Sequence, residues 1–221
     1  MAWSPDGANI AYFVTQGTKT NLAISDANNK NARTIYTTPI PDFTIQWLTK
    51  KIVLLISRPS GLAPSLVLQI NIDSKQVSTV FSGIPGIVLV PTPDGSGFLY
   101  SRSTANGTPD TIAVYSLKDA SITSLNEITV TDKCIFSPDG KKLYCGIPSG
   151  SILPPSPDSW YRGDTSFTDA IVAIDLSTHQ ETTLAASPTI DVDVTSPFMS
   201  SDEKYLFFID RKTSTLWRLD L

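Results

Sequence analysis

A five-residue phrase that returns at nearly constant spacing is the strongest constraint on the fold of this chain. Trp3-Ser4-Pro5-Asp6-Gly7 recurs as Phe136-Ser137-Pro138-Asp139-Gly140, and Pro91-Thr92-Pro93-Asp94-Gly95 is a weaker copy. Two degenerate copies begin at Trp47 and Met199. The first positions of the copies, 3, 47, 91, 136 and 199, are separated by 44, 44, 45 and 63 residues. A period in the mid-forties is the length of one blade of a β-propeller.

The sequence after each copy predicts four short strands. In the second unit, for example, apolar runs at 52–56 and 68–73 are followed by a Thr- and Val-containing run at 77–81 and by a run leading to the next aromatic or apolar position. Short β-branched and aromatic runs separated by turn residues indicate antiparallel sheets, and no helical period of ten or more residues is evident. We therefore predict an all-β fold: a β-propeller of four-stranded antiparallel blades, with five repeat units in one domain over residues 1–221.

The repeated Ser-Pro-Asp-Gly phrase has a structural explanation. Pro fixes φ at the entry of a tight turn, Asp hydrogen-bonds the backbone, and Gly adopts positive φ without steric cost. We expect the phrase to form the hairpin between the innermost and second strands of a blade, with the preceding aromatic residue packed between blades. No catalytic or metal-binding role is expected for its aspartates.

The last repeat interval is longer than the others because of an insertion at 149–167, between the second and third strands of its blade. The insertion is Pro-rich and carries Trp, Tyr and Arg, which are the residue types enriched at binding hot spots. Loops on a rigid scaffold often carry function. We predict partner-binding residues on the propeller face opposite the Ser-Pro-Asp-Gly hairpins: Trp160, Tyr161, Arg162 and Asp164 from the insertion, and Arg58 from another connection. The alternative, which we slightly favour, is that Trp160 and Phe167 fold back as a plug over the blade or the central channel, with Tyr161, Arg162 and Asp164 still exposed.

The two cysteines flank one predicted hairpin. A two-residue loop at Asp139-Gly140 places Cys134 directly opposite Cys145 on adjacent antiparallel strands. Opposed Cβ atoms lie about 4.5–5.5 Å apart, which is close to disulfide range. We expect a disulfide, and a pair of reduced core thiols is the alternative. A disulfide would favour an oxidising, extracytoplasmic compartment.

The residue types that are scarce exclude several functions. The net charge is −4, and no basic run exceeds two residues, so nucleic acid is not expected as a partner. No apolar run is long enough to span a bilayer, so we expect no direct membrane insertion by this segment. The one histidine, His179, lies in a polar turn, and Asp191 and Asp193 lack the spacing of a calcium loop. We therefore predict no catalytic residue, no cofactor and no metal site.

The Trp-Ser-Pro-Asp-Gly phrase and the apolar run after it resemble the repeat of TolB-like β-propellers, which are related to WD-repeat proteins. Several later segments are also similar to envelope-anchored propellers of small-genome bacteria. These segments are Lys133-Cys134, Tyr144-Cys145, 157–161 and Leu216-Trp217. This resemblance implies a non-catalytic interaction platform in the cell envelope, at the periplasm or cell surface, with another envelope protein or a glycan as its partner.

Two alternatives to a free-standing binding platform remain. The chain is an accessory propeller of a larger hydrolase of the prolyl-peptidase type, or, as the least favoured reading, a propeller lyase or hydrolase with its site in the central channel. The repeats reach both ends of the sequence, so we expect a domain truncated at its N-terminal end and a membrane anchor outside this segment. Upstream chain or a second chain would then complete a ring of six to eight blades, and a five-bladed ring with an imperfect seam is the alternative.

Overall fold

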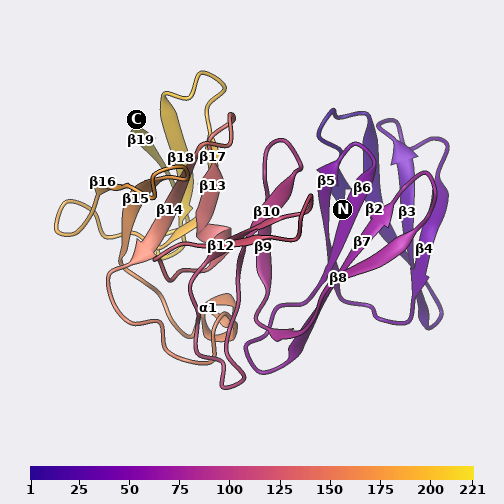
Figure 1. Ribbon diagram of the computed structural model, residues 1–221, viewed down its shortest axis with the longest axis horizontal. Coiled ribbons are helices and arrows are strands. Elements are labelled where there is room, and N and C mark those ends of the chain that lie inside the picture. Colours follow the sequence, from indigo (N-terminus) through magenta and orange to yellow (C-terminus); the bar gives the residue numbers. More distant parts are fainter. The chain divides into compact units, whose positions relative to one another are not determined.

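The protein is described by a computed structural model that covers residues 1–221, and its regular secondary structure is almost entirely antiparallel β-sheet (Figure 1). Nineteen strands form five sheets, of which four have four strands and the last has three. Strands that follow each other along the chain are neighbours in every sheet, so each sheet is a meander. The prediction of a β-propeller built from four-stranded antiparallel blades is confirmed.

The chain divides into two compact units, and the first comprises Met1–Pro59 and Pro64–Ile84. It contains the first two blades, whose facing sides bury a core that includes Leu22, Trp47 and Val53. The indole N–H of Trp47 donates a hydrogen bond to the carbonyl of Ala2 at 3.0 Å. The strands of the first blade are β1 (Ala2–Trp3), β2 (Asn9–Gln16), β3 (Lys19–Asp26) and β4 (Arg33–Thr38); those of the second are β5 (Phe43–Thr49), β6 (Ile52–Ser57), β7 (Pro64–Asn71) and β8 (Val77–Pro85).

The second unit comprises Ser60–Ala63 and Pro85–Leu221 and holds the other three blades. One core cluster, with Leu99, Phe136 and Leu143, lies between the third and fourth blades. Another, with Val194 and Phe208, lies between the fourth and fifth. The strands of this unit are β9 (Val88–Pro91), β10 (Gly97–Ser101), β11 (Ala113–Ser116) and β12 (Ile122–Ser124); β13 (Cys134–Phe136), β14 (Lys142–Pro148), β15 (Asp169–Asp175) and β16 (Glu181–Ala185); β17 (Val194–Met199), β18 (Tyr205–Asp210) and β19 (Thr215–Asp220).

The Ser-Pro-Asp-Gly phrase forms the hairpin between the first two strands of its blade. In the fourth blade the Ser137 hydroxyl donates to Asp139 Oδ1 at 2.7 Å and accepts the Lys142 N–H at 2.9 Å. Gly140 closes the turn with φ of 70°. The serine therefore ties together both ends of the turn, a role that was not predicted from the sequence. The same Ser/Thr–Asp bond recurs at Ser4–Asp6, Thr92–Asp94 and Ser200–Asp202.

The aromatic residue before this turn behaves differently from blade to blade. Phe136 and Trp47 are buried in cores between blades, whereas Trp3 is exposed. Two short helices were not predicted: the 3₁₀-helix η1 (Thr131–Lys133) and the α-helix α1 (Asp158–Arg162). A single turn of helix is too short to produce a hydrophobic period. Neither helix has the length and apolar character that crossing a membrane requires.

Candidate partner-binding face

The insertion joins β14 to β15 and carries α1, and it is hydrogen-bonded to the connections of earlier blades within the second unit. Asp158 at the start of α1 accepts the N–H of Gly61, in the connection between β6 and β7, at 2.7 Å. The Ser156 carbonyl accepts the Ser103 hydroxyl at 2.5 Å, and its N–H donates to the Gly107 carbonyl at 2.8 Å, in the connection between β10 and β11. The insertion therefore lies across the second-to-third-strand connections rather than projecting into solvent.

Glycines make this close approach possible. A Cβ atom added to Gly61 would lie 2.2 Å from the Ser156 carbonyl oxygen, a separation that non-bonded atoms do not adopt. A Cβ atom on Gly107 would lie 3.1 Å from Pro155 Cα, and Gly107 also has φ of 74°. Gly61 is thus required because the insertion backbone packs directly against it. Gly107 is required for the same close approach and for its positive φ.

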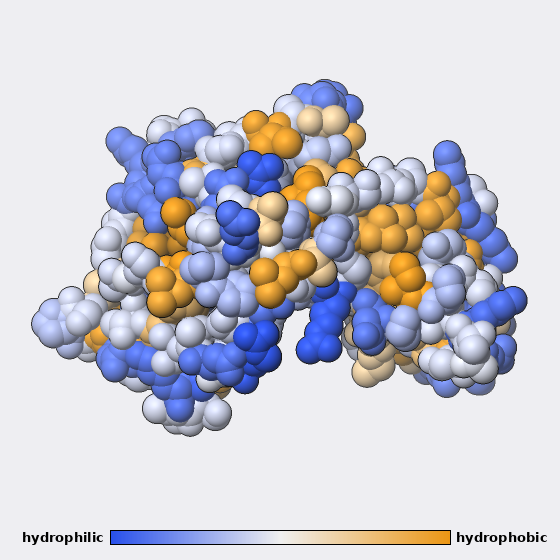
Figure 2. Space-filling view, turned by 90° about the horizontal axis from the view of Figure 1, so that it is seen from below, coloured by the Kyte–Doolittle hydropathy of each residue, from blue (hydrophilic) through white to orange (hydrophobic).

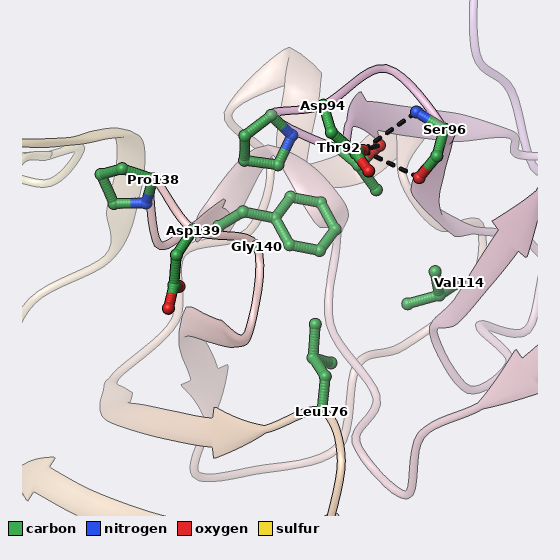
Figure 3. A pocket seen from close by; sticks show the side chains of 10 residues that line it. Thr92, Asp94, Ser96, Val114, Pro138, Asp139, Gly140 and Leu176 are labelled. Carbon is green, nitrogen blue, oxygen red and sulfur yellow. Dashed lines mark hydrogen bonds between the residues drawn. The ribbon is translucent and has the colours of Figure 1, made fainter.

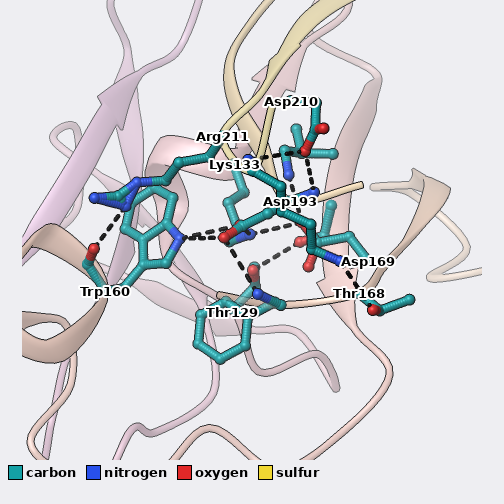
Figure 4. Close-up of polar contacts among 12 residues, drawn as sticks. Thr129, Lys133, Trp160, Thr168, Asp169, Asp193, Asp210 and Arg211 are labelled. Carbon is teal, nitrogen blue, oxygen red and sulfur yellow. Dashed lines mark hydrogen bonds and ion pairs between the residues drawn. The ribbon is translucent and has the colours of Figure 1, made fainter. Parts of the chain in front are cut away.

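Trp160 anchors the insertion in a buried polar cluster (Figure 4). Its side chain is only 3% exposed, and its indole N–H donates to Oδ1 and Oδ2 of Asp193 at 3.0 and 3.1 Å. The ammonium group of Lys133, which is fully buried, forms ion pairs with Asp193 and, at 2.6 Å, with Asp169. The Phe167 N–H donates to Asp193 at 3.2 Å. One carboxylate thus holds η1, α1 and the end of the insertion together.

The cluster places one positive charge between two carboxylates in the protein interior. Burial raises the pKa of Asp169, and the neighbouring Lys133 ammonium opposes that increase. Asp169 Oδ2 also accepts the Val194 N–H at 2.7 Å, whereas Oδ1 is buried without a hydrogen-bond partner. Buried charges are tolerated only when they are paired and hydrogen-bonded. The arrangement therefore depends on Lys133.

Arg211, in the connection between β18 and β19, holds the C-terminal end of α1. Its guanidinium donates to the carbonyls of Trp160 and Tyr161 at 2.6 and 3.2 Å, and its Cζ lies 4.8 Å from the centre of the Trp160 ring. Lys133 lies 5.0 Å from the same ring. Cations over an indole face and at a helix C-terminus are both favourable. Trp160 therefore packs against two cations, Lys133 and Arg211.

Three of the predicted partner-binding residues lie together at the exposed surface of α1 and the segment after it. Tyr161 is 38% exposed and donates its hydroxyl to Asp132 at 2.6 Å. Burial of the phenol and the Asp132 carboxylate raise the pKa of Tyr161, and burial raises the pKa of Asp132. Arg162 and Asp164 form an exposed ion pair at 2.8 Å. The side chains available to a partner are therefore an aromatic ring, a guanidinium and two carboxylates.

The other predicted site residues lie elsewhere. Trp160 is buried, as in the alternative of an insertion folded back on the blade, so it supports the surface without forming part of it. Phe167 is partly buried in the same cluster. Arg58 is exposed in the first unit, where its N–H donates to the Asp42 carbonyl at 3.1 Å. Whether any of these residues binds a partner stays a prediction.

Sequence reasoning missed the residues that hold the insertion in place. Lys133 is a single lysine beside a cysteine, and Arg211 occupies an ordinary turn. Asp193 was considered only with Asp191 as a calcium ligand. In the structure Asp193 faces the buried cluster, whereas Asp191 is exposed and pairs with Lys212 and Thr168. The contacts of the cluster join residues that are far apart in the sequence, so no local sequence pattern identifies it.

The predicted disulfide between Cys134 and Cys145 is present, and these residues are directly opposite each other in the β13–β14 pairing. It crosses the hairpin of the blade that carries the insertion, and both cysteines are buried. His179 is exposed in the turn between β15 and β16, with φ of 58°.

The fold is similar to those of solved β-propellers. TolB from Acinetobacter baumannii matches with a TM-score of 0.58 at 19% identity, over 99% of this chain and 53% of that one. An oligogalacturonate lyase in complex with manganese matches with a TM-score of 0.66 at 14% identity, over 92% of this chain and 54% of that one. The β-propeller domain of the Trilobed protease from Pyrococcus furiosus, which has an open velcro topology, matches with a TM-score of 0.62 at 13% identity. The match covers 98% of this chain and 65% of that one.

The chain therefore has a TolB-like β-propeller fold. It spans about half to two-thirds of the length of these three structures. At sequence level it matches no protein-family model and no curated protein.

Proposed function

We propose that this chain is a non-catalytic binding platform of the cell envelope, which binds another envelope protein or a glycan through the surface of α1. The observation that carries this proposal is the contrast between the exposed side chains of Tyr161, Arg162 and Asp164 and the firmly anchored backbone beneath them. A surface that is already fixed in position loses little conformational entropy when a partner binds.

The chemistry of the surface supports a polar partner. Figure 2 views the molecule from below relative to Figure 1, and on this side hydrophilic and hydrophobic residues are interspersed without one continuous apolar area. Around α1 the ring of Tyr161 offers a stacking surface, and Arg162 offers a guanidinium that donates in a fixed plane. Tyrosine and arginine contribute disproportionately to binding energy at interfaces.

The proposal is tested by identifying the partner and then weakening its binding. A photo-crosslinking amino acid at Arg162 in the full-length protein, in its native cell, should capture the partner. The Tyr161→Ala/Arg162→Ala variant should then bind the purified partner at least tenfold more weakly, which corresponds to about 1.4 kcal/mol. Lys141→Ala, on the hairpin side of the same blade, is the matched control and should bind normally. Equal affinities for both variants would contradict the proposal.

A second candidate function is an accessory propeller of a larger hydrolase. The similarity to the propeller domain of the Trilobed protease supports it. In this case the parent protein would react with a fluorophosphonate probe of serine hydrolases, and the reaction would be lost when the additional domain is removed. A parent protein that carries a membrane anchor and shows no such labelling would support the binding platform instead.

The extracytoplasmic location is supported by the disulfide. Cytosolic reductants keep most thiols reduced, whereas disulfides persist in the periplasm and at the cell surface. Intact cells are quenched with acid, and the protein is then alkylated under denaturing conditions. The reagent should label neither cysteine unless a reductant is added first. Labelling of both cysteines without reductant would contradict this location.

A further inference from the structure

A cavity lies at the other end of the blades from the insertion. It is an open pocket lined mainly by the β9–β10 and β13–β14 hairpins of neighbouring blades in the second unit, and its volume is about 240 Å³ (Figure 3). We call it the hairpin cavity. The insertion connects β14 to β15 at the opposite end of these strands, so the cavity is separate from the proposed partner-binding surface.

The floor of the hairpin cavity is apolar. Phe136, Val114 and Leu176 line it, and all three belong to or pack against the core between the third and fourth blades. Pro93 and Pro138, one from each hairpin, also line it. A hydrocarbon segment that entered the cavity would thus exchange water for contact with the top of a packed core.

The rim of the cavity carries two carboxylates, Asp94 and Asp139, one from each hairpin. Within each turn Oδ1 is the acceptor: it accepts the Ser96 N–H at 3.0 Å in one hairpin and the Ser137 hydroxyl at 2.7 Å in the other. No hydrogen bond is made to Oδ2 of Asp94, and Oδ2 of Asp139 meets only the exposed Lys141 at 3.5 Å. Each carboxylate therefore retains acceptor capacity toward a ligand.

Both carboxylates are ionised at neutral pH. The Ser96 N–H is the main cause of a lowered pKa at Asp94, and the Ser137 hydroxyl is the main cause at Asp139. The residues that line the cavity include no lysine or arginine. The ligand that fits must accordingly combine a hydrocarbon stem with a cationic end.

We propose that the hairpin cavity binds a lysine or arginine side chain exposed on a partner protein. The methylene stem of such a side chain would pack on Phe136, Val114 and Leu176, and its charged end would reach the carboxylate at one side of the rim, Asp94 or Asp139. Long basic side chains ordinarily bury their stems and leave the charge in a polar environment. The net charge of −4 favours the approach of a basic surface.

The test uses the peptides acetyl-Gly-Lys-Gly-amide and acetyl-Gly-Arg-Gly-amide, with acetyl-Gly-norleucine-Gly-amide as the neutral probe of similar shape. Backbone amide signals of the ¹⁵N-labelled 221-residue chain report the binding position. The cationic peptides should shift the signals of both hairpins with Kd on the order of 1 mM. Binding should weaken at 1 M salt, where the screening length falls to about 3 Å.

Matched variants distinguish the cavity from any acidic turn. Asp94→Asn/Asp139→Asn keeps an Oδ1 acceptor for each turn and should weaken peptide binding at least tenfold. Asp202→Asn makes the same change in the equivalent β17–β18 turn, which does not line the cavity, and should leave binding unchanged. The proposal is overturned if the norleucine peptide binds as well as the lysine peptide, or if the double variant retains binding. If the free polyamine spermidine binds at the same amides more tightly and saturably, the ligand of the cavity is a small molecule, and the proposal of a protein side chain is wrong.

Discussion

The two ends of the blade β13–β16 are held by polar networks of opposite kinds. At the hairpin end, Ser137 and Asp139 bond each other two residues apart, and the same bond recurs in three other blades. At the insertion end, Lys133 pairs with Asp169 and Asp193, which are 36 and 60 residues away, and no other blade repeats the arrangement. The hairpin network is local and only partly buried, whereas the insertion network is long-range and fully buried. The repeated end belongs to the scaffold, and the unique end supports the surface that we assign to binding.

The strongest test of this contrast is removal of the buried ammonium group. Lys133→Met leaves Asp169 and Asp193 as uncompensated buried carboxylates, and we expect it to destabilise the protein by about 3–5 kcal/mol. Guanidinium denaturation followed by tryptophan fluorescence measures the loss. At the hairpin end, Lys141→Met removes an exposed cation that lies 3.5 Å from Asp139, and its effect should be that of an ordinary surface substitution.

A compensated variant separates charge from packing. Lys133→Met combined with Asp169→Asn and Asp193→Asn removes the unpaired charges and keeps an oxygen acceptor for the Trp160 indole. It should recover most of the stability lost in Lys133→Met. If the triple variant is no more stable than the single variant, the lysine acts through its packing and the assignment of a charge network is wrong.

The same contrast explains how much the sequence predicts. The hairpin network is periodic and local, so the copies at Trp3, Pro91 and Phe136 predicted the blades, their turns and the pairing of Cys134 with Cys145. The insertion was predicted because the last interval between repeats is longer than the others. The contacts that hold it, from Lys133 and Arg211, join residues far apart in the sequence, and a single charged residue carries no pattern that reveals its burial. Trp160 was therefore assigned to the binding surface, although its ring lies in the interior.

Two glycine substitutions, with effects of intermediate size, test the difference between the hairpin end and the insertion end. In Gly61→Ala the new Cβ atom meets the Ser156 carbonyl, whereas in Gly140→Ala it meets nothing closer than 3.8 Å but must adopt φ near 70°. We expect a loss of about 1–3 kcal/mol from overpacking in the first variant and about 1–2 kcal/mol from left-handed strain in the second.

Hydrogen exchange distinguishes these two mechanisms. Gly61→Ala should increase exchange at the backbone amides of α1, because the insertion must move away from the β6–β7 connection. Gly140→Ala should increase exchange only around its own hairpin. Faster exchange of α1 in both variants would show that the two ends of the blade are coupled, and would remove the distinction between them.

The smallest expected effect comes from a carboxyl pair that belongs to neither network. Burial, followed by a hydrogen bond and repulsion from Glu181, raises the pKa of Glu127 from 4.5 to about 7. The folded protein therefore binds a proton at Glu127 that the unfolded chain releases, so stability should fall as pH rises from about 4.5 to about 7. The turn aspartates have the opposite sign: the pKa of Asp139 is lowered by its Ser137 bond, so its contribution is lost as pH falls.

Glu181→Gln tests this assignment directly, because it removes the repulsion and returns the pKa of Glu127 toward its ordinary value. Denaturation midpoints between pH 4.5 and 7.5 should then decline less than in the unmodified protein. Glu203→Gln, in the exposed β17–β18 turn, is the control and should leave the decline unchanged. Carbon NMR of the Glu127 carboxyl gives the pKa itself, and an ordinary value in the unmodified protein would show that the two carboxyls do not share a proton. A decline of stability over this pH range would then have to come from the other carboxyls whose pKa is raised by burial, Asp132 and Asp169.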